Sequence, residues 1–163
     1  MKKIILLLIL FSSCIINSQT LYWVGGSGNW SDANHWSLVS GGASSGIVPT
    51  PSTHLIFDDN STASDAEIEA IQSIEVSSID VSIQNYNIKL IGSNLITLKL
   101  NSYANFNPHF KFNFNGKVIL TPTHNVSYDF SHTTFSNEIV VNSNYDVELG
   151  AIYSISNVTF TGN

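Results

Sequence analysis

Large apolar side chains recur at every second position over the second half of this chain. The positions between them are polar, as in Ile79-Asp80-Val81-Ser82-Ile83. A period of two places alternate side chains on opposite faces of an extended strand. The chain is therefore predicted to be all-β, with strands that each bury one face. The stretches with this pattern are Ile79–Ile83, Ile96–Leu100, Phe110–Phe114, Val126–Phe130 and Tyr145–Leu149.

The connections between these stretches leave two architectures open. Strand centres follow one another after roughly seven to twelve residues. Three short strands per coil would match one turn of a parallel β-helix, or solenoid. The opposing signal is Asn115-Gly116, because Asn-Gly between two strands favours a hairpin and hence an antiparallel β-sandwich. This dipeptide occurs once, so the β-helix is the preferred prediction and the sandwich is the alternative.

One segment has features of a helix. Ser64 and Glu67 have the spacing of a capping box, and Ala66, Ile68, Ala70 and Ile71 follow or surround them. The flanking β-branched residues argue against a helix. Residues 64–71 are therefore the one candidate helix of the chain, and a weak one.

Three tryptophans and three glycines lie within Leu21–Ser37, and the chain has no other tryptophan. A stack of strands must cover its terminal core, and Trp buries much apolar area per residue. We therefore expect Trp23, Trp30 and Trp36 to seal the first end of the strand stack. The alternative is an aromatic platform that contacts carbohydrate rings.

The first residues have the layout of a secretory signal peptide. Lys2-Lys3 precede an apolar run from Ile4 to Phe11, which is too short to span a membrane. Cleavage after Ser18 would divide the chain into a signal (1–18), a Trp/Gly-rich cap and loop (19–60) and a strand region (61–163). The alternative is lipidation of Cys14 and a lipid anchor. The prediction is therefore export without a membrane span, to the medium or the cell surface.

The negative net charge and the lack of arginine argue against nucleic acid and anionic membranes as partners. Removing residues 1–18 shifts the net charge from −6 to −8, because four lysines then face twelve acids, and the chain has no arginine. An acidic chain without Arg is poorly suited to nucleic acid or anionic membranes. No internal disulfide is available, since Cys14 is the single cysteine.

The candidate metal ligands are few. Asp58, Asp59 and Asp65 form the densest group of oxygen ligands and are a weak candidate for calcium. Their spacing fits neither an EF-hand loop nor an RTX nonapeptide, so a solvated turn is preferred and no cofactor is expected, with calcium as the alternative. The five histidines (His35, His54, His109, His124 and His132) have no paired zinc-binding spacing.

The tryptophan segment resembles the opening of large exported proteins of Bacteroidetes-type bacteria. Those proteins begin with Trp-Val-Gly-Gly-x-Gly-Asn-Trp-Ser-Asp-x-x-x-Trp after the signal peptide, and Trp23 to Trp36 match it. Gly41-Gly42, Pro49 and Ile56-Phe57-Asp58 match the continuation. The resemblance implies a right-handed parallel β-helix and a role as a surface adhesin or matrix protein, often with a C-terminal sorting domain. This chain is much shorter than those proteins, so a fragment or a minimal relative is expected.

The function expected from these features is that of an exported, non-enzymatic, adhesin-like or matrix protein. Its expected partners are glycans or other surface proteins. The outward acids and lysines, such as Asp80 and Lys99, are too sparse to assign to an acid/base pair. A carbohydrate-binding module or polysaccharide lyase or hydrolase is the alternative, and a truncated, nonfunctional reading frame is the third hypothesis.

Overall fold

The computed structural model describes residues 18–92, 95–113, 116–130, 138–150 and 157–161. The predicted signal peptide, apart from Ser18, lies outside these residues, and so does Cys14. Within the described residues the regular structure consists of β-strands and one short 3-10 turn, η1 (Ala33–His35).

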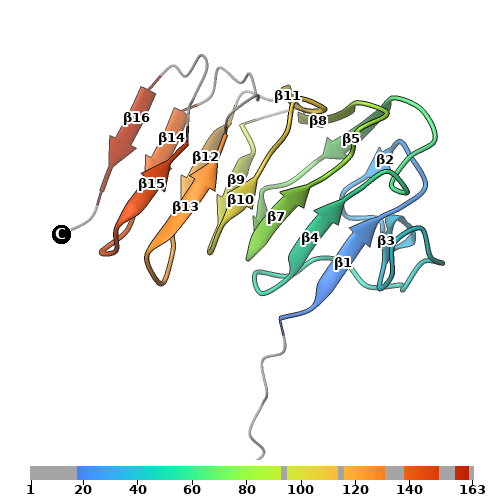
Figure 1. Cartoon of the computed structure of the whole chain (residues 1–163), viewed down its shortest axis with the longest axis horizontal. Coiled ribbons are helices and arrows are strands. Elements are labelled where there is room, and N and C mark those ends of the chain that lie inside the picture. Colours follow the sequence, from blue (N-terminus) through green and yellow to red (C-terminus); the bar gives the residue numbers. More distant parts are fainter. Residues whose placement is uncertain (1–17, 93–94, 114–115, 131–137, 151–156, 162–163) are drawn as a thin grey trace, which may run out of the picture.

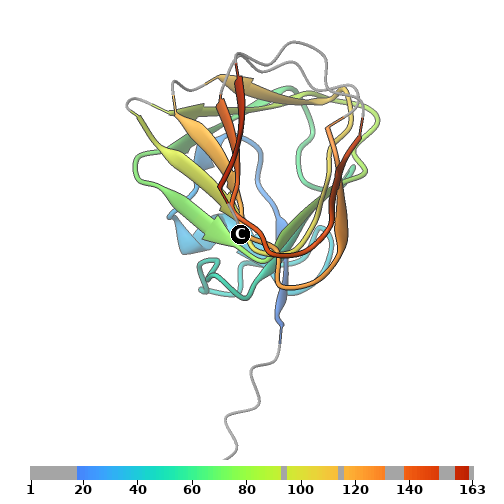
Figure 2. The same ribbon diagram turned by 90° about the vertical axis from the view of Figure 1, so that its left-hand side faces the viewer.

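Three sheets wrap around one interior and form a parallel β-helix of about four turns (Figures 1 and 2). Sheet A contains, in spatial order, β15 (Val147–Leu149), β13 (Val126–Asp129), β10 (Ala104–Asn105), β7 (Ser78–Val81), β4 (His54–Phe57), β1 (Thr20–Trp23) and β3 (Trp36–Ser37). Sheet B contains β11 (Phe110–Asn113), β8 (Ile88–Gly92), β5 (Ala66–Ala70) and β2 (Gly28–Asn29). Sheet C contains β16 (Asn157–Phe160), β14 (Glu138–Val141), β12 (Lys117–Leu120), β9 (Thr97–Leu100) and β6 (Ile74–Val76).

Successive coils stack in register, so equivalent positions form columns along the long axis. In sheet A, Leu21 pairs with Leu55, and the column continues through Ile79, Ala104 and Tyr128. All five side chains are buried. Burial of a large apolar side chain contributes about 1.5–3 kcal/mol, so each coil adds a similar increment to one continuous core. The alternation read from the sequence therefore describes the inward columns, and the predicted parallel β-helix is confirmed.

Phenylalanines extend this core along the axis. Phe57 contacts Phe110 with ring centroids 5.1 Å apart, and Phe110 contacts Phe106 at 5.4 Å. Phe106 in turn stacks with Phe130 at 5.6 Å. The expectation that Phe106, Phe110 and Phe112 pack in the core is confirmed, since all three are buried. Phe114 lies outside the described residues.

Two local signals in the sequence, at residues 64–71 and at Asn115-Gly116, predict structures that do not form because the coils pair with one another. Residues 66–70 form strand β5, and the helix considered for 64–71 is wrong. Ala66, Ile68 and Ala70 are buried while Glu67 and Glu69 are exposed, which is a period of two. Parallel pairing with β2 on one side and β8 on the other satisfies the backbone of β5 and outweighs the helical propensity of Ala and Glu.

Gly116 serves to bring neighbouring coils together. β11 pairs with β8 in sheet B and β12 pairs with β9 in sheet C, so the two strands that flank Asn115-Gly116 form no hairpin. A Cβ atom at Gly116 would lie 1.4 Å from the carbonyl oxygen of Ile96. Glycine is therefore required here for close backbone approach at a corner of the coil. The antiparallel sandwich that this dipeptide suggested is wrong.

Candidate functional site

The three tryptophans pack into the first end of the core. Trp23 and Trp36 are fully buried and Trp30 is 7% exposed. The ring of Trp36 meets Trp23 and Trp30 edge-on at centroid distances of 5.0 and 5.1 Å, and Phe57 contacts all three rings. The indole N–H of Trp36 donates to the carbonyl of Trp30 at 2.8 Å, and that of Trp23 donates to the carbonyl of Gly26 at 2.7 Å. In this arrangement the indole faces contact the core and leave no exposed platform for a sugar ring.

The glycines of the cap make room for His35. The imidazole of His35 stacks on Trp23 with centroids 4.7 Å apart and an interplanar angle of 5°. Its Nδ1 lies 2.8 Å from the carbonyl oxygen of Val24. A Cβ at Gly28 would lie 2.0 Å from Nε2 of His35, and Gly25 adopts a φ of 87° beside the same ring. The Trp/Gly motif is thus one packing unit built on Trp23, His35 and the bare backbone around them.

The three aspartates considered for calcium are engaged in separate turns. Asp59 Oδ1 accepts hydrogen bonds from the backbone N–H groups of Gln84 and Asn85 at 2.7 and 3.2 Å. Asp65 Oδ1 accepts from the Asn87 N–H at 2.8 Å, and this bond lowers the pKa of Asp65. Asp58 Oδ1 accepts from the Asn60 N–H in its own turn. In the described part of the chain, no group of three or more His, Cys, Asp and Glu side chains is placed to hold a metal.

His54 belongs to a polar column on the outer face of sheet A. Its Nδ1 lies 2.7 Å from the hydroxyl of Ser78, and the hydroxyl of Tyr103 lies 3.4 Å from the same ring. Burial lowers the pKa of His54, and the nearby Asp80 carboxylate opposes this shift. Burial also raises the pKa of Tyr103. His132 lies outside the described residues.

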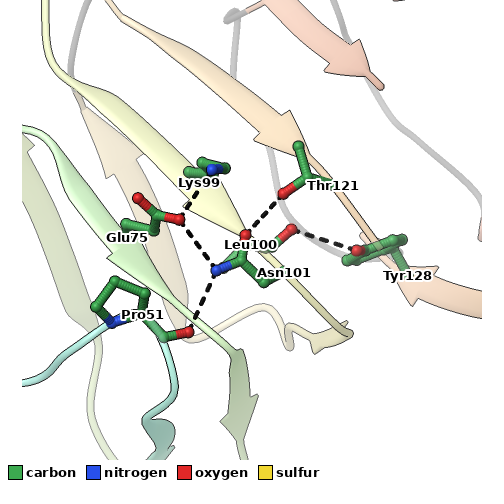
Figure 3. Close-up of polar contacts among 7 residues, drawn as sticks. All are labelled: Pro51, Glu75, Lys99, Leu100, Asn101, Thr121 and Tyr128. Atoms are coloured by element: carbon green, nitrogen blue, oxygen red, sulfur yellow. Dashed lines mark hydrogen bonds and ion pairs between the residues drawn. The ribbon is translucent and has the colours of Figure 1, made fainter. Parts of the chain in front are cut away.

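Hydrogen bonds beside sheet C link residues from four successive coils (Figure 3). Asn101 is at the centre: its Nδ2 donates to Glu75 and to the carbonyl of Pro51, and its Oδ1 accepts from Thr121 at 2.7 Å. Lys99 donates to Glu75 at 2.8 Å, which is the largest cause of the lowered pKa of Glu75. These contacts join residues 20 to 50 positions apart, and they tie the coils to one another.

The outer face of sheet B holds the candidate site. Two adjoining hollows, of about 370 and 340 Å³, share Glu67 as a lining residue and follow strand β8. Strand β8 lies between β5 and β11 in sheet B (Figure 1). We call the two hollows together the sheet B trough. The first hollow is lined by Asp65, Ala66, Glu67, Asn87, Lys89 and Lys111, and the second by Glu67, Glu69, Ile91, Gly92 and Asn113.

In-register pairing brings the trough residues together from three coils. Glu67, Lys89 and Lys111 occupy equivalent positions on β5, β8 and β11. The Lys89 ammonium binds Glu67 Oε1 at 2.7 Å, with both side chains about half exposed. Glu69, Ile91 and Asn113 form the next outward column. The trough thus combines carboxylates, amines, two amides and an apolar floor, which is a set suited to hydrogen-bonding a polar ligand.

Sequence reasoning missed Glu67 and Glu69 as site residues because it weighed a helix at that segment. The signal was present in the strict alternation Ala-Glu-Ile-Glu-Ala and in the matching Ile-Lys-Leu of β8. Their juxtaposition depends on a spacing of 22 residues between paired strands, which no local pattern reports.

A further hollow of about 570 Å³ lies between the cap and the next coil. Gly25, Gly26 and Ser27 line one side and Asp59 to Ser64 the other. Its lining is already tied together, since Gly26 N–H donates to Ser61 O at 3.2 Å and Glu67 N–H donates to the Ser27 hydroxyl at 3.0 Å. We assign this hollow to the junction between the cap and the coils.

No helix among the described residues is both long and apolar enough to cross a membrane. Comparison with known proteins found no matching family, no matching curated protein and no matching solved structure.

Proposed function

We propose that this chain is an exported, non-enzymatic, adhesin-like surface or matrix protein, whose β-helix acts as a rigid support for a polar binding surface. Glycans or other surface proteins are the partners in this proposal. The observation that carries it is the network around Asn101, in which outward polar groups bond from coil to coil. Such bonds stiffen the stack along its axis.

The outward columns also suit weak, repeated contacts. Neighbouring coils present equivalent positions about 4.8 Å apart, so ligand-binding groups recur along the surface. Single contacts through exposed amides, hydroxyls and water contribute little, but several of them on one ligand raise the apparent affinity strongly. A stiff scaffold favours this effect because the groups need no ordering when the ligand binds.

The test of this proposal is whether the protein binds glycans without cleaving them. The purified protein, coupled to beads at high density, is applied to a glycan array and to intact cells, and reducing-sugar release is measured on the same polysaccharides. We expect retention on a subset of glycans that falls steeply with coupling density, and no release of reducing ends. Release of reducing ends above that of heat-denatured protein would favour the polysaccharide-degrading alternative.

Export is tested separately with a tagged full-length protein expressed in a Bacteroidetes host. We expect the tag in the medium or on the cell surface, and the same distribution for Cys14→Ser. Loss of surface retention or of fatty-acid labelling in Cys14→Ser would establish the lipid anchor instead.

A further inference from the structure

Lys111 differs from the other lysines of the described chain. Its in-register neighbour on β8 is Lys89, whose ammonium is already bound to Glu67. Asp65 lines the same hollow as Lys111, but its carboxylate is bonded to Asn87 and forms no ion pair with Lys111. Lys111 therefore lines the sheet B trough without an ion pair among the described residues. The three lysines that do form ion pairs are Lys89 with Glu67 at 2.7 Å, Lys99 with Glu75 at 2.8 Å and Lys117 with Glu138 at 3.5 Å.

The opposite corner of the trough carries an unpaired carboxylate. Glu69 is exposed on β5, and its side chain makes no hydrogen bond or ion pair within the described residues. Glu69 and Lys111 lie two strands apart and two residues apart along the strand direction, so their Cα atoms are about 12 Å from each other at the usual spacings. This distance is too large for a direct ion pair. A bound molecule of that length can contact both groups at once.

Beside Glu69 and Asn113 the floor of the trough is apolar, whereas the ion pair of Lys89 with Glu67 lies beside Lys111. The apolar floor consists of Ile91 and Gly92 on β8, and Gly92 contributes no side chain. Asn113 flanks the floor from β11. A flat ring with an aliphatic face and polar edges fits a floor of this kind, because its C–H face contacts Ile91 while its hydroxyl groups reach Glu69 and Asn113.

From this arrangement we infer that the sheet B trough binds an acidic saccharide, with the carboxylate of a hexuronate unit at Lys111 and sugar hydroxyls at Glu69 and Asn113. This inference rests on the proposed function and names the ligand class and the site. The uronate supplies the counter-charge that Lys111 lacks, and the Glu69 carboxylate accepts hydrogen bonds from hydroxyl groups, which are donors. A neutral sugar satisfies Glu69 but leaves Lys111 without a carboxylate.

The experiment titrates the purified protein with digalacturonate and, as the matched neutral probe, with digalactose, by calorimetry and saturation-transfer NMR. We expect digalacturonate to bind more tightly and its affinity to fall between 50 and 300 mM salt. Lys111→Gln weakens digalacturonate binding by roughly tenfold, as expected for loss of one charge-assisted hydrogen bond. The control Lys117→Gln, at an exposed lysine on sheet C, leaves binding unchanged.

The outcomes separate this site from the general function. Equal affinity for the two probes, or equal losses in Lys111→Gln and Lys117→Gln, overturns the inference. If Lys111→Gln binds digalacturonate normally while the coupled protein is still retained on glycan arrays, the site is wrong and the proposed function stands. If the protein is retained on no glycan or cell surface, the proposed function itself fails. Circular dichroism of both variants verifies that each is folded.

Discussion

The cap and the coils of this protein are stabilised in different ways. In the cap, residues 20–37, particular side chains meet once: Trp36 bonds to the backbone of Trp30, and His35 stacks on Trp23. In the coils the same kind of contact repeats, and an inward column such as Leu55-Ile79-Ala104 needs only apolar residues of suitable volume. The cap therefore requires particular residues at particular positions, whereas the coils require only an alternation of apolar and polar residues. This difference explains why the cap carries a recognisable motif and the strand region does not.

The topology differs in the same way. β3 pairs antiparallel to β1, while every other pair among the described strands is parallel. This reversal turns the chain across the first end of sheet A and carries Trp36 over the core. β3 covers the outer edge of β1, and as a two-residue edge strand whose Trp36 carbonyl accepts from the Ser45 N–H it leaves little unpaired backbone at that end. The cap thus ends the stack in two ways, by covering the core and by occupying the sheet edge.

The largest effect is expected for Trp36→Ala. The substitution removes a fully buried indole and leaves the carbonyl of Trp30 without its donor. We expect a loss of about 3–5 kcal/mol in the free energy of unfolding, measured by chemical denaturation. In the coils, where only apolar volume is required, the volume-conserving variant Leu98→Met at an equally buried position should cost less than about 1.5 kcal/mol. Equal losses would show that cap and coils tolerate change alike.

The next largest loss of stability is expected for substitution of Gly116 in the coils and Gly28 in the cap. These variants test whether the coils also contain positions that accept only glycine. In Gly116→Ala the new Cβ meets a backbone oxygen, which cannot move without shifting the coil. In Gly28→Ala it meets the ring of His35, which can rotate away. We expect destabilisation of about 1–3 kcal/mol in both, with the larger value for Gly116→Ala.

A double-mutant cycle sharpens the result for Gly28. In a His35→Ala background, Gly28→Ala should cost less than it does alone, because the steric conflict has been removed. Additive costs would mean that His35 is not what Gly28 accommodates.

Much of this fold can be predicted from the sequence, because its core depends on local alternation. The buried positions of β7, β9 and β13 follow directly from it. The sequence predictions are wrong where a local signal competes with pairing between coils. The capping-box pattern predicts a helix where β5 forms, and Asn115-Gly116 predicts a hairpin next to β12. The sheet B trough depends wholly on such pairing, since Glu67 and Lys89 meet only after the coil has closed. The unpaired state of Lys111 could not be inferred before the register was known.

A smaller effect is expected at Asn101, which tests whether outward polar groups stabilise the coils. Asn101→Ala removes the bonds to Glu75, Pro51 and Thr121 (Figure 3). We expect a loss of about 1–1.5 kcal/mol, since the partners remain partly solvated. The control Gln72→Ala, at an exposed position, should change stability by less than about 0.5 kcal/mol. If the two variants lose the same free energy of unfolding, the hydrogen bonds of Asn101 do not stabilise the stack of coils.

The smallest effect is the pH dependence at His54, in the first coil beyond the cap. Burial lowers the pKa of His54, so the unfolded chain binds a proton more readily than the folded one. The stability from neutral His54 is therefore present above its ordinary pKa of 6.5 and declines as the pH falls below that value. Ser78, Tyr103 and Asp80 surround the ring, and only the Asp80 carboxylate favours protonation.

We expect His54→Gln to flatten the fall in unfolding free energy between pH 7 and 5, whereas His124→Gln, at an exposed histidine, leaves the slope unchanged. Glu75 does not confuse the comparison, because its pKa lies below 4.5 and the stability from its bonds is lost only at lower pH. A slope that persists in His54→Gln would place the acid sensitivity elsewhere. A flattened slope would show that burial of an ionisable group affects the stability of the coils, whereas the cap is held by ring packing and by the hydrogen bonds of its indole N–H groups.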